Sequence, residues 1–384
     1  MHIGFDAKRA YHNKTGLGYY SRTLIGLLTQ HYPANEYFLF NPKPSSLFDF
    51  SGSNVHEVLP SGFFDKMLSS AWRSSWMKKD IKKNGIQLYH GLSHEIPVGI
   101  QHTNTRSVVT IHDLIHERHP EQYNPIDVKI YHKKFLNACE HANKVIAISE
   151  QTKKDIVELY EIPESKVAVS LQSANPVFQQ PANDTEKNEI RRRYKLPVEF
   201  FLYVGSIIER KNLLNVCKAM YVLGDEWKIP LVVIGDGGKY KQLVKDLIAE
   251  KKIGDKIIFL SEKEEVRNDP AFKEPRTLGI IYQMAIAMIY PSFYEGFGMP
   301  VLEAILSRTP VITSNISCLP EVGGNAAYYV DPNNAEEIAA GMKKIYENAS
   351  FAEEMKSKGI KYAERFAPEK YVRHMMDIYK EVLK

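Results

Sequence analysis

The stretch FYEGFGMPVLEA, residues 293–304, places two glutamates on either side of a Gly-Phe-Gly sequence. Proline is favoured in the first turn of a helix, so Pro300 predicts a helix that continues over residues 301–306. A helix start offers unpaired amide hydrogens and a positive dipole end, and the glycines let a ligand approach the backbone. Ligands of parallel α/β sheets bind at the carboxyl ends of strands. The stretch therefore predicts such a sheet with an anion at this helix start.

Strand-sized apolar runs alternate with longer amphipathic stretches along the whole chain. The first half contains HIGFD, VVTIH and KVIAIS, and the part after residue 200 contains FFLYVGS, LVVIGDGG, KIIFL, AMIYPS and TPVITS. This alternation predicts parallel sheets that are covered by helices on both faces.

The length of 384 residues favours two domains, since one domain takes roughly 150 residues. Residues 173–189 contain two prolines and many polar residues, which is typical of an interdomain connection. We therefore expect an N-terminal Rossmann-like domain at 1–178 and a C-terminal one at 179–365. Residues 366–384 have apolar positions at helical spacing, and we expect this last helix to pack back on the N-terminal domain.

Composition and charge exclude several classes of protein. Hydrophobic residues make up 44% and charged residues 25%, as in ordinary globular proteins. A net charge of +4 is too small for a dedicated nucleic-acid binder. The three cysteines show no paired spacing, so neither a disulfide framework nor a zinc site is indicated. With no apolar run of about 20 residues, we expect a cytoplasmic protein.

Two carboxylates around one phosphate would repel it, so Glu295 and Glu303 are interpreted as hydrogen-bond acceptors for a sugar hydroxyl and a ribose hydroxyl. A nucleotide sugar has that layout of sugar, diphosphate and ribose. The alternative is an ordinary glycine turn with solvated glutamates. VGSIIERKNL follows another predicted strand and carries Arg210 and Lys211, two cations that can neutralise a diphosphate. Alone, such a pair is usually a solvated surface pair.

Taken together, YVGSIIERKN, VVIGDGG and PSFYEGFGMPVLEAILSRTPVITSNISCLPEVGGNAAYYVDP resemble the C-terminal domain of retaining glycosyltransferases of family 4. The family's Glu-x7-Glu motif falls on Glu295 and Glu303. The resemblance covers most of residues 200–332, and TGLGYYSRTL, VVTIHDLIHERHPEQY and VIAISEQTKKDI are weaker echoes in the first half. It implies the GT-B fold, in which two Rossmann-like domains with parallel sheets face each other across a cleft.

The resemblance also implies a role for several residues of the C-terminal domain, which would bind the nucleotide sugar. Neither Lys211 nor Glu295 is expected in the core. The assignments are the diphosphate for Arg210, Lys211 and the amides of Gly298 and Met299, the ribose for Glu303, and a catalytic position at the donor sugar or its adjacent phosphate for Glu295.

In the N-terminal domain, His112 ends a predicted strand and matches the family histidine that contacts the donor sugar near the reacting carbon, although a lone histidine at a strand end is more often structural. Asp113 is expected to cap the following turn. Gly16 and Gly18 are expected to form a loop after the first strand that approaches the substrate; the alternative is a plain flexible turn. GDGG at 235–238 lacks dinucleotide-binding spacing and is given no catalytic part.

The function that the resemblance implies is transfer of a hexose, with retention, from a nucleoside-diphosphate sugar to a hydroxyl of a glycan or lipid-linked glycan acceptor in surface polysaccharide synthesis. TGLGYYSRTL and TIHDLIHERHPEQY are similar to bacterial polysaccharide mannosyltransferases, which favours mannose. No Asp-x-Asp occurs, so no metal and no cofactor are expected. The alternatives are a nucleotide-sugar epimerase or phosphorylase on the same scaffold, and a non-catalytic nucleotide-sugar-binding protein.

Residues 67–85 combine Trp72 and Trp76, one helical turn apart, with Arg73 and four lysines. This combination suits an interfacial helix on anionic lipid, which would make the protein peripheral at the inner face of the membrane. The alternative, which we prefer because the segment is short, is a core-packed helix with a solvated basic face.

Overall fold

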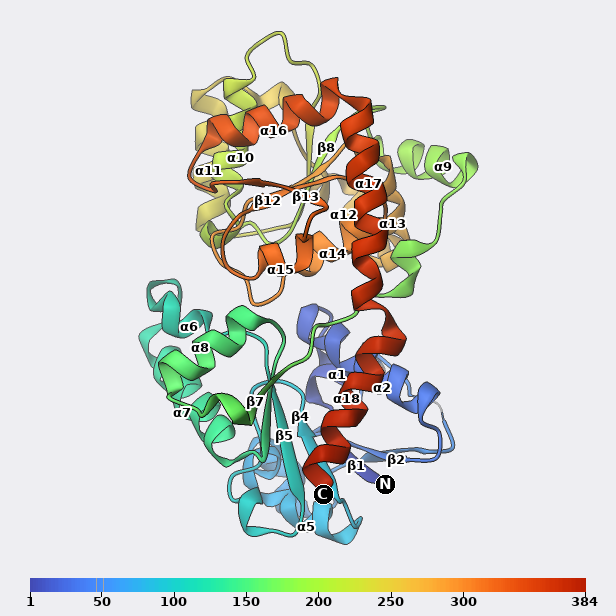
Figure 1. Ribbon diagram of the computed structural model, residues 1–384, viewed down its shortest axis with the longest axis vertical. Coiled ribbons are helices and arrows are strands. Elements are labelled where there is room, and N and C mark those ends of the chain that lie inside the picture. The colour runs from blue at the N-terminus through green and yellow to red at the C-terminus, as the bar shows by residue number, and fades with distance from the viewer. Residues whose placement is uncertain (46, 51) are drawn as a thin grey trace. The chain divides into compact units, whose positions relative to one another are not determined.

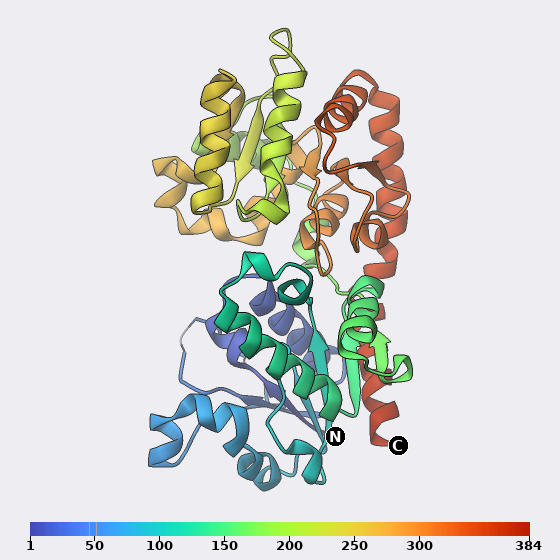
Figure 2. The same cartoon turned by 90° about the vertical axis from the view of Figure 1, so that its left-hand side faces the viewer.

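The computed structural model describes residues 1–45, 47–50 and 52–384. The chain folds into two compact units, each shown in Figures 1 and 2. Unit 1 contains Met1–Ser173 and Phe366–Lys384, and unit 2 contains Ala174–Arg365.

Unit 1 is built on a parallel sheet that has seven strands among the described residues, in the order β3-β2-β1-β4-β5-β6-β7. Its buried strands are rich in β-branched and aromatic residues, as expected for a sheet covered on both faces. The strands are β1 (His2–Asp6), β2 (Glu36–Phe40), β3 (Val55–Val58), β4 (Leu88–Gly91), β5 (Arg106–Ile111), β6 (Lys144–Ala147) and β7 (Val167–Val169).

The helices of unit 1 lie on both faces of this sheet (Figure 1). They are α1 (Lys8–His12), α2 (Gly16–His31), α3 (Phe63–Met67), α4 (Ser69–Ala71), α5 (Lys78–Lys83), α6 (Ile115–Arg118), α7 (Pro125–His141), α8 (Glu150–Tyr160) and α18 (Pro368–Leu383). The last helix packs on α2 and β5, and its apolar stripe, which includes Tyr371, Met375 and Tyr379, is buried in the core of unit 1.

Unit 2 is a second parallel sheet, of six strands in the described chain, with the order β10-β9-β8-β11-β12-β13. The strands are β8 (Phe201–Val204), β9 (Leu231–Ile234), β10 (Ile257–Phe259), β11 (Met288–Tyr290), β12 (Val311–Ser314) and β13 (Ala327–Val330). The helices are α9 (Asp184–Tyr194), α10 (Leu213–Val222), α11 (Lys239–Glu250), α12 (Glu264–Arg267), α13 (Pro275–Met284), α14 (Met299–Leu306), α15 (Leu319–Gly323), α16 (Ala335–Glu347) and α17 (Ala349–Ala363).

In each sheet, the first strand has earlier-added strands on one side and later-added strands on the other, so the strand order reverses next to it. In unit 1, β1 lies between β2 and β4, and in unit 2, β8 lies between β9 and β11. These are the switch points at which parallel α/β sheets bind ligands, beyond the carboxyl ends of the strands. The prediction of two Rossmann-like domains with parallel sheets is confirmed, and each domain offers one such edge.

The stretch 173–189, predicted as a connection, is mostly structured. Phe178 is buried in unit 2, where it packs against Tyr282, and α9 begins at Asp184 behind a capping box formed by Asn183 and Glu186. The contacts of Phe178 explain why the division of the chain lies after Ser173, upstream of the predicted boundary.

Candidate active site

The carboxyl edge of the unit 2 sheet carries two of the predicted segments on neighbouring strands. Arg210 and Lys211 lie in η6 (Glu209–Lys211), a 3₁₀ turn that follows β8. Glu295 lies in the loop between β11, which pairs with β8, and α14. Because parallel neighbours end at the same edge, the two segments meet although they are far apart in sequence.

Arg210 and Glu295 form a close ion pair. Arg210 Nη1 lies 2.9 Å from Glu295 Oε2, and Nη1 also donates to the carbonyl oxygen of Tyr294. Both side chains are buried, with only about a tenth of each accessible. The expectation that Glu295 lies outside the core is therefore wrong, since it is half of a buried pair.

Several further groups fix the Glu295 carboxylate. The Tyr290 hydroxyl donates to Oε1 over 2.7 Å, and the Ser292 hydroxyl lies 3.0 Å from the same oxygen. Burial alone would raise the pKa of Glu295, but the charges of Lys211 and Arg210 and the Tyr290 hydrogen bond outweigh it and lower the pKa. Glu295 is therefore a fixed anion at neutral pH.

Lys211 is held more loosely than Arg210. Its Nζ lies 4.0 Å from Glu295 Oε1 and 5.4 Å from the centre of the Tyr290 ring. Gly205, at the end of β8, leaves room for it, because a Cβ there would come within 3.2 Å of the Lys211 side chain. The Lys211 ammonium thus keeps hydrogens available for a ligand.

Glu303, on α14, has a different environment from Glu295. Its Oε2 accepts a long 3.3 Å hydrogen bond from the Tyr282 hydroxyl. Burial raises the pKa of Glu303 to about 7, and the Tyr282 bond and the charge of Lys211 offset this only in part. Lys211 therefore acts electrostatically on both glutamates of the Glu-x7-Glu motif, which the structure brings to one place.

The start of α14 completes this cluster. Gly298 is the residue before the helix, with φ of 99°, and a Cβ there would meet Leu319 Cδ2 at 2.8 Å. Pro300 lies in the first turn, as predicted. The amides of Gly298 and Met299 donate to no other residue in the described chain, so they are the unsatisfied donors expected at a helix start. We call Arg210, Lys211, Glu295, Glu303 and this helix start the donor cluster.

Unit 1 places His112 directly after β5, at its carboxyl end. It is buried, and its Nε2 lies 2.9 Å from the Leu92 carbonyl oxygen. A carbonyl only accepts, so Nε2 carries the proton and Nδ1 is left as an acceptor. Burial and the charge of Arg9 lower the pKa of His112 to about 4, so the ring is neutral at pH 7.

Sequence reasoning missed the neighbours of His112. The Tyr20 and His112 rings are nearly perpendicular, with 4.5 Å between their centres, and the centre of the His94 ring lies 5.1 Å from that of His112. Arg9 is close enough to lower the pKa of both histidines. The only signal in the sequence was that Arg9 and His94 each come within a few residues after the end of a strand, and these strands end at the same edge of the sheet.

Two minor predictions have opposite outcomes. Asp113 does cap its turn, because its Oδ1 accepts from the Ile115 amide over 3.1 Å. Gly16 and Gly18 do not form a loop, because α2 begins at Gly16 and both lie in its first turn. Gly18 permits a close contact there, since a Cβ would sit 1.9 Å from the Asn13 carbonyl oxygen, whereas a Cβ on Gly16 would meet nothing within 4 Å.

Family models match both units. The model of glycosyl transferases group 1 matches residues 185–366, and that of glycosyltransferase family 4 matches residues 21–170. The chain belongs to glycosyltransferase family 4. It is 27% identical to the O-antigen chain mannosyltransferase B of Escherichia coli, over 99% of this chain and all of that one. It is 28% identical to the O-antigen chain mannosyltransferase RfbU of Salmonella typhimurium, over 62% of this chain and 60% of that protein.

Solved structures establish the fold of this glycosyltransferase as GT-B. A glycosyltransferase from Rickettsia africae superposes with a TM-score of 0.74 at 19% identity and covers 100% of this chain and 98% of its own. Anabaena HepE in complex with UDP-glucose superposes with a TM-score of 0.71 at 12% identity, over 99% of this chain and 100% of that one.

The segment 67–85 of the glycosyltransferase agrees only in part with the preferred, core-packed prediction. Trp72 is fully buried, and its Nε1 donates to Asp80 over 2.7 Å. Arg73 is not part of a solvated basic face, because it pairs with Asp6 and Glu95. Trp76 is 40% exposed. A membrane contact through Trp72 is therefore excluded, and the preferred core-packed interpretation holds for Trp72 but not for Trp76.

Proposed function

We propose that this glycosyltransferase moves a hexose, with mannose as the first candidate, from a nucleoside-diphosphate sugar to a hydroxyl of a glycan or lipid-linked glycan acceptor. We further propose that transfer retains the anomeric configuration, needs no metal ion or cofactor, and serves the synthesis of a surface polysaccharide. The observation that carries the proposal is the donor cluster, in which two cations and a helix start gather with two glutamates whose pKa values are shifted in opposite directions.

The donor cluster suits a diphosphate flanked by hydroxyl groups. Lys211 and the amides of Gly298 and Met299 supply charged and neutral donors for phosphate oxygens. Arg210 adds its charge while its guanidinium stays fixed to Glu295. We assign Glu303 to the ribose, because a carboxylate accepts hydrogen bonds from hydroxyls. HepE has the same fold and was crystallised in complex with UDP-glucose, which supports a nucleotide-sugar donor here.

The chemical difficulty of the reaction is the charge on the leaving diphosphate. Hydrogen-bond donors that are already oriented toward the diphosphate stabilise that charge without reorganisation. Such electrostatic stabilisation is usually the largest contribution to catalysis. Both oxygens of Glu295 are engaged, one by Arg210 and one by Tyr290, so we assign it hydrogen-bonding and positioning roles rather than that of a nucleophile. Attack from the same face, with the departing phosphate taking the acceptor proton, then gives retention.

His112 has the features of an acceptor for a sugar hydroxyl. Its Nδ1 lone pair is left over once Nε2–H is committed to Leu92, and its low pKa keeps the ring neutral in the working range of pH. We therefore assign it to the transferred hexose, where it orients a hydroxyl near the reacting carbon.

The mannose and polysaccharide parts of the proposal rest on the relatives. The full-length match to an O-antigen chain mannosyltransferase supports a mannose donor and a polysaccharide product.

Of the residues described, none belong to a helix long and apolar enough to cross a membrane. We propose a peripheral contact through an apolar patch that consists of Phe63, Phe64, Met67, Leu68 and Trp76, all of them exposed.

Calorimetric titration with GDP-mannose, UDP-glucose and UDP-N-acetylglucosamine tests the donor, with GDP-mannose expected to bind most tightly. Lys211→Ala should weaken binding of that donor about tenfold or more, because a charge-assisted hydrogen bond is lost. Lys218→Ala, on α10 and away from the cluster, is the control. Product analysis with and without acceptor separates transfer from epimerisation and phosphorolysis. An unaffected Lys211→Ala variant, or a product of inverted configuration, would contradict the respective part of the proposal.

A further inference from the structure

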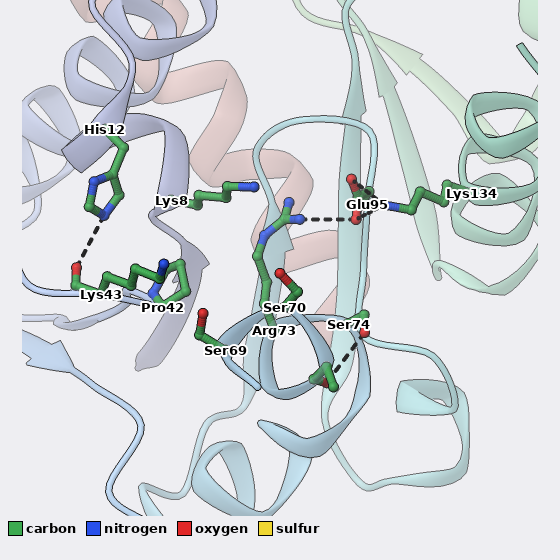
Figure 3. A pocket seen from close by; sticks show the side chains of 11 residues that line it. Lys8, His12, Pro42, Lys43, Ser69, Ser70, Arg73, Ser74, Glu95 and Lys134 are labelled. Atoms are coloured by element: carbon green, nitrogen blue, oxygen red, sulfur yellow. Dashed lines mark hydrogen bonds and ion pairs between the residues drawn. The ribbon is translucent and has the colours of Figure 1, made fainter. Parts of the chain in front are cut away.

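A hollow of about 440 Å³ opens at the carboxyl edge of the unit 1 sheet, beside its switch point. Figure 3 shows the side chains that line it. They come from α1, from the chain after β2 and β4, from α7 and from the segment of α4 and η1 (Trp72–Trp76). The lining residues include Lys8, His12, Lys43, Ser69, Arg73 and Lys134.

One cation of the hollow is fixed by the protein itself. Arg73 Nε donates to both carboxylate oxygens of Asp6, and Nη1 donates to Glu95 over 3.0 Å. Lys134 lies 3.4 Å from Glu95 on its other side. The Asp6 and Glu95 carboxylates are thus paired with cations, and they repel an incoming anion less than their charges suggest.

Two other cations have no such partner. The ammonium groups of Lys8 and Lys43 form no hydrogen bond or ion pair with any residue that the structure describes. Figure 3 shows Lys8 extended toward Arg73. Burial, followed by the positive charges of Arg73 and Arg9, lowers the pKa of Lys8. An anion in the hollow would relieve this repulsion.

The wall of the hollow adds neutral donors. Ser69 is buried and Ser70 is exposed, and neither hydroxyl bonds to another described residue. Hydroxyl groups and lysine ammonium groups around one space are the donor set that binds phosphate oxygens. A cavity of this volume is large enough for a diphosphate.

We propose that this hollow binds a phosphate or diphosphate group of the acceptor, through Lys8, Lys43 and the Ser69 hydroxyl. The inference deepens the proposed function, on which it rests, by specifying an anionic acceptor. It assigns unit 1 an anion site built from its own residues.

The surroundings suggest where that phosphate comes from. A second hollow shares Pro42 and Lys43 with the first and extends to Lys66 on α3. That helix carries Phe63, Phe64 and Met67 of the apolar patch. A prenyl diphosphate could therefore place its phosphates beside Lys43 and its chain toward α3, whereas a soluble sugar phosphate would use the first hollow alone.

Calorimetric titration of the full chain with inorganic pyrophosphate tests the site. All variants carry Lys211→Ala, so that the donor cluster contributes little. Lys8→Gln/Lys43→Gln should weaken pyrophosphate binding roughly tenfold or more. Lys129→Gln/Lys361→Gln removes the same charge from exposed positions outside the hollow and should leave binding unchanged. Equal affinity of the two double variants would overturn the proposal.

Further titrations distinguish the two sources of phosphate. Farnesyl diphosphate that binds more tightly than pyrophosphate, and loses that affinity in Lys8→Gln/Lys43→Gln, supports a lipid acceptor. Equal binding of mannose 1-phosphate and farnesyl diphosphate, with the same dependence on both lysines, supports a soluble one. These measurements need no turnover. If the lysines govern binding but no sugar is transferred, the hollow stands and the proposed function fails.

Discussion

Replacement of Glu303 by glutamine should stabilise the protein at alkaline pH and weaken its binding of the donor. In the folded chain the pKa of Glu303 is about 7, because burial disfavours its charge, against an ordinary value of 4.5. The folded state therefore holds a proton that the unfolded state has lost, and the free energy of unfolding falls as pH rises from about 4.5 to about 7. At about 1.36 kcal/mol per pKa unit, the cost of ionising Glu303 is roughly 3 kcal/mol above that window.

Glutamine keeps the shape of the side chain and an oxygen for Tyr282, but it carries no charge to desolvate. Glu303→Gln should thus be more stable than the parent by up to about 3 kcal/mol at about pH 8.5, and by less than about 1 kcal/mol at about pH 5. Urea unfolding followed by circular dichroism at both pH values measures the difference. Glu226→Gln, at an exposed turn of unit 2, provides the control and should show no comparable change.

The same variant tests the role assigned to Glu303. A ribose hydroxyl donates more strongly to a carboxylate than to an amide oxygen, so nucleotide binding should weaken about tenfold above pH 7. A group that costs stability but contributes to binding is the expected trade at a functional site. If Glu303→Gln gains no stability between pH 5 and pH 8.5, the buried, proton-holding carboxyl inferred from the structure is wrong.

Three further outcomes are expected. Glu295→Ala should lose about 3 kcal/mol in urea unfolding as well as turnover, because it leaves Arg210 buried without its carboxylate; unchanged stability would contradict that pairing. Gly298→Ala should lose at least about 1 kcal/mol, since φ is 99° and Leu319 blocks the new Cβ, while Gly26→Ala, where nothing lies within 4 Å, should not. Burial lowers the pKa of His90 to about 3 and that of His112 to about 4, so unfolding free energy should fall by about 2 kcal/mol for each between pH 6.5 and pH 5, and a flat profile would count against their burial.

Local signals account for the part of the site that the sequence predicts. Strand, glycine turn and proline-led helix follow one another within residues 288–306, and each is specified by neighbours in sequence. The meeting of Arg210 with Glu295 also follows, once β8 and β11 are recognised as parallel strands, because their carboxyl ends share an edge.

Pairings between distant segments could not be predicted in this way. Nothing near Arg73 in sequence indicates that Asp6 will neutralise it, and the lysines of residues 67–85 made it look like one more surface cation. The two tryptophans of that segment have similar neighbours in sequence, but only Trp72 finds Asp80 as an acceptor within the core. Burial of a charged or aromatic side chain depends on the partner it finds, and that partner is set by tertiary structure.

In unit 2, arginine and lysine divide the work of holding an anion. The Arg210 guanidinium binds Glu295 and a backbone carbonyl, and these contacts fix its position. Lys211 lies at the limit of an ion pair with the same carboxylate and keeps its ammonium hydrogens for a ligand. The planar arginine is the better group to anchor, and the compact lysine is the better group to leave free, because its three hydrogens can turn toward any oxygen.

Unit 1 also has an anchored arginine and a lysine left available for a ligand, although no sequence motif predicted them. Arg73 is anchored by the buried carboxylate of Asp6, and the Lys8 ammonium near it forms no hydrogen bond or ion pair with a described residue. Burial, followed by the positive charges of Arg73 and Arg9, lowers the pKa of Lys8, so its charge is unfavourable in the free protein and an anion beside it would offset that cost. If Lys8 lowers the stability of the free protein but contributes to anion binding, then Lys8→Gln should raise that stability while it weakens pyrophosphate binding. A loss of both would instead make Lys8 a structural residue.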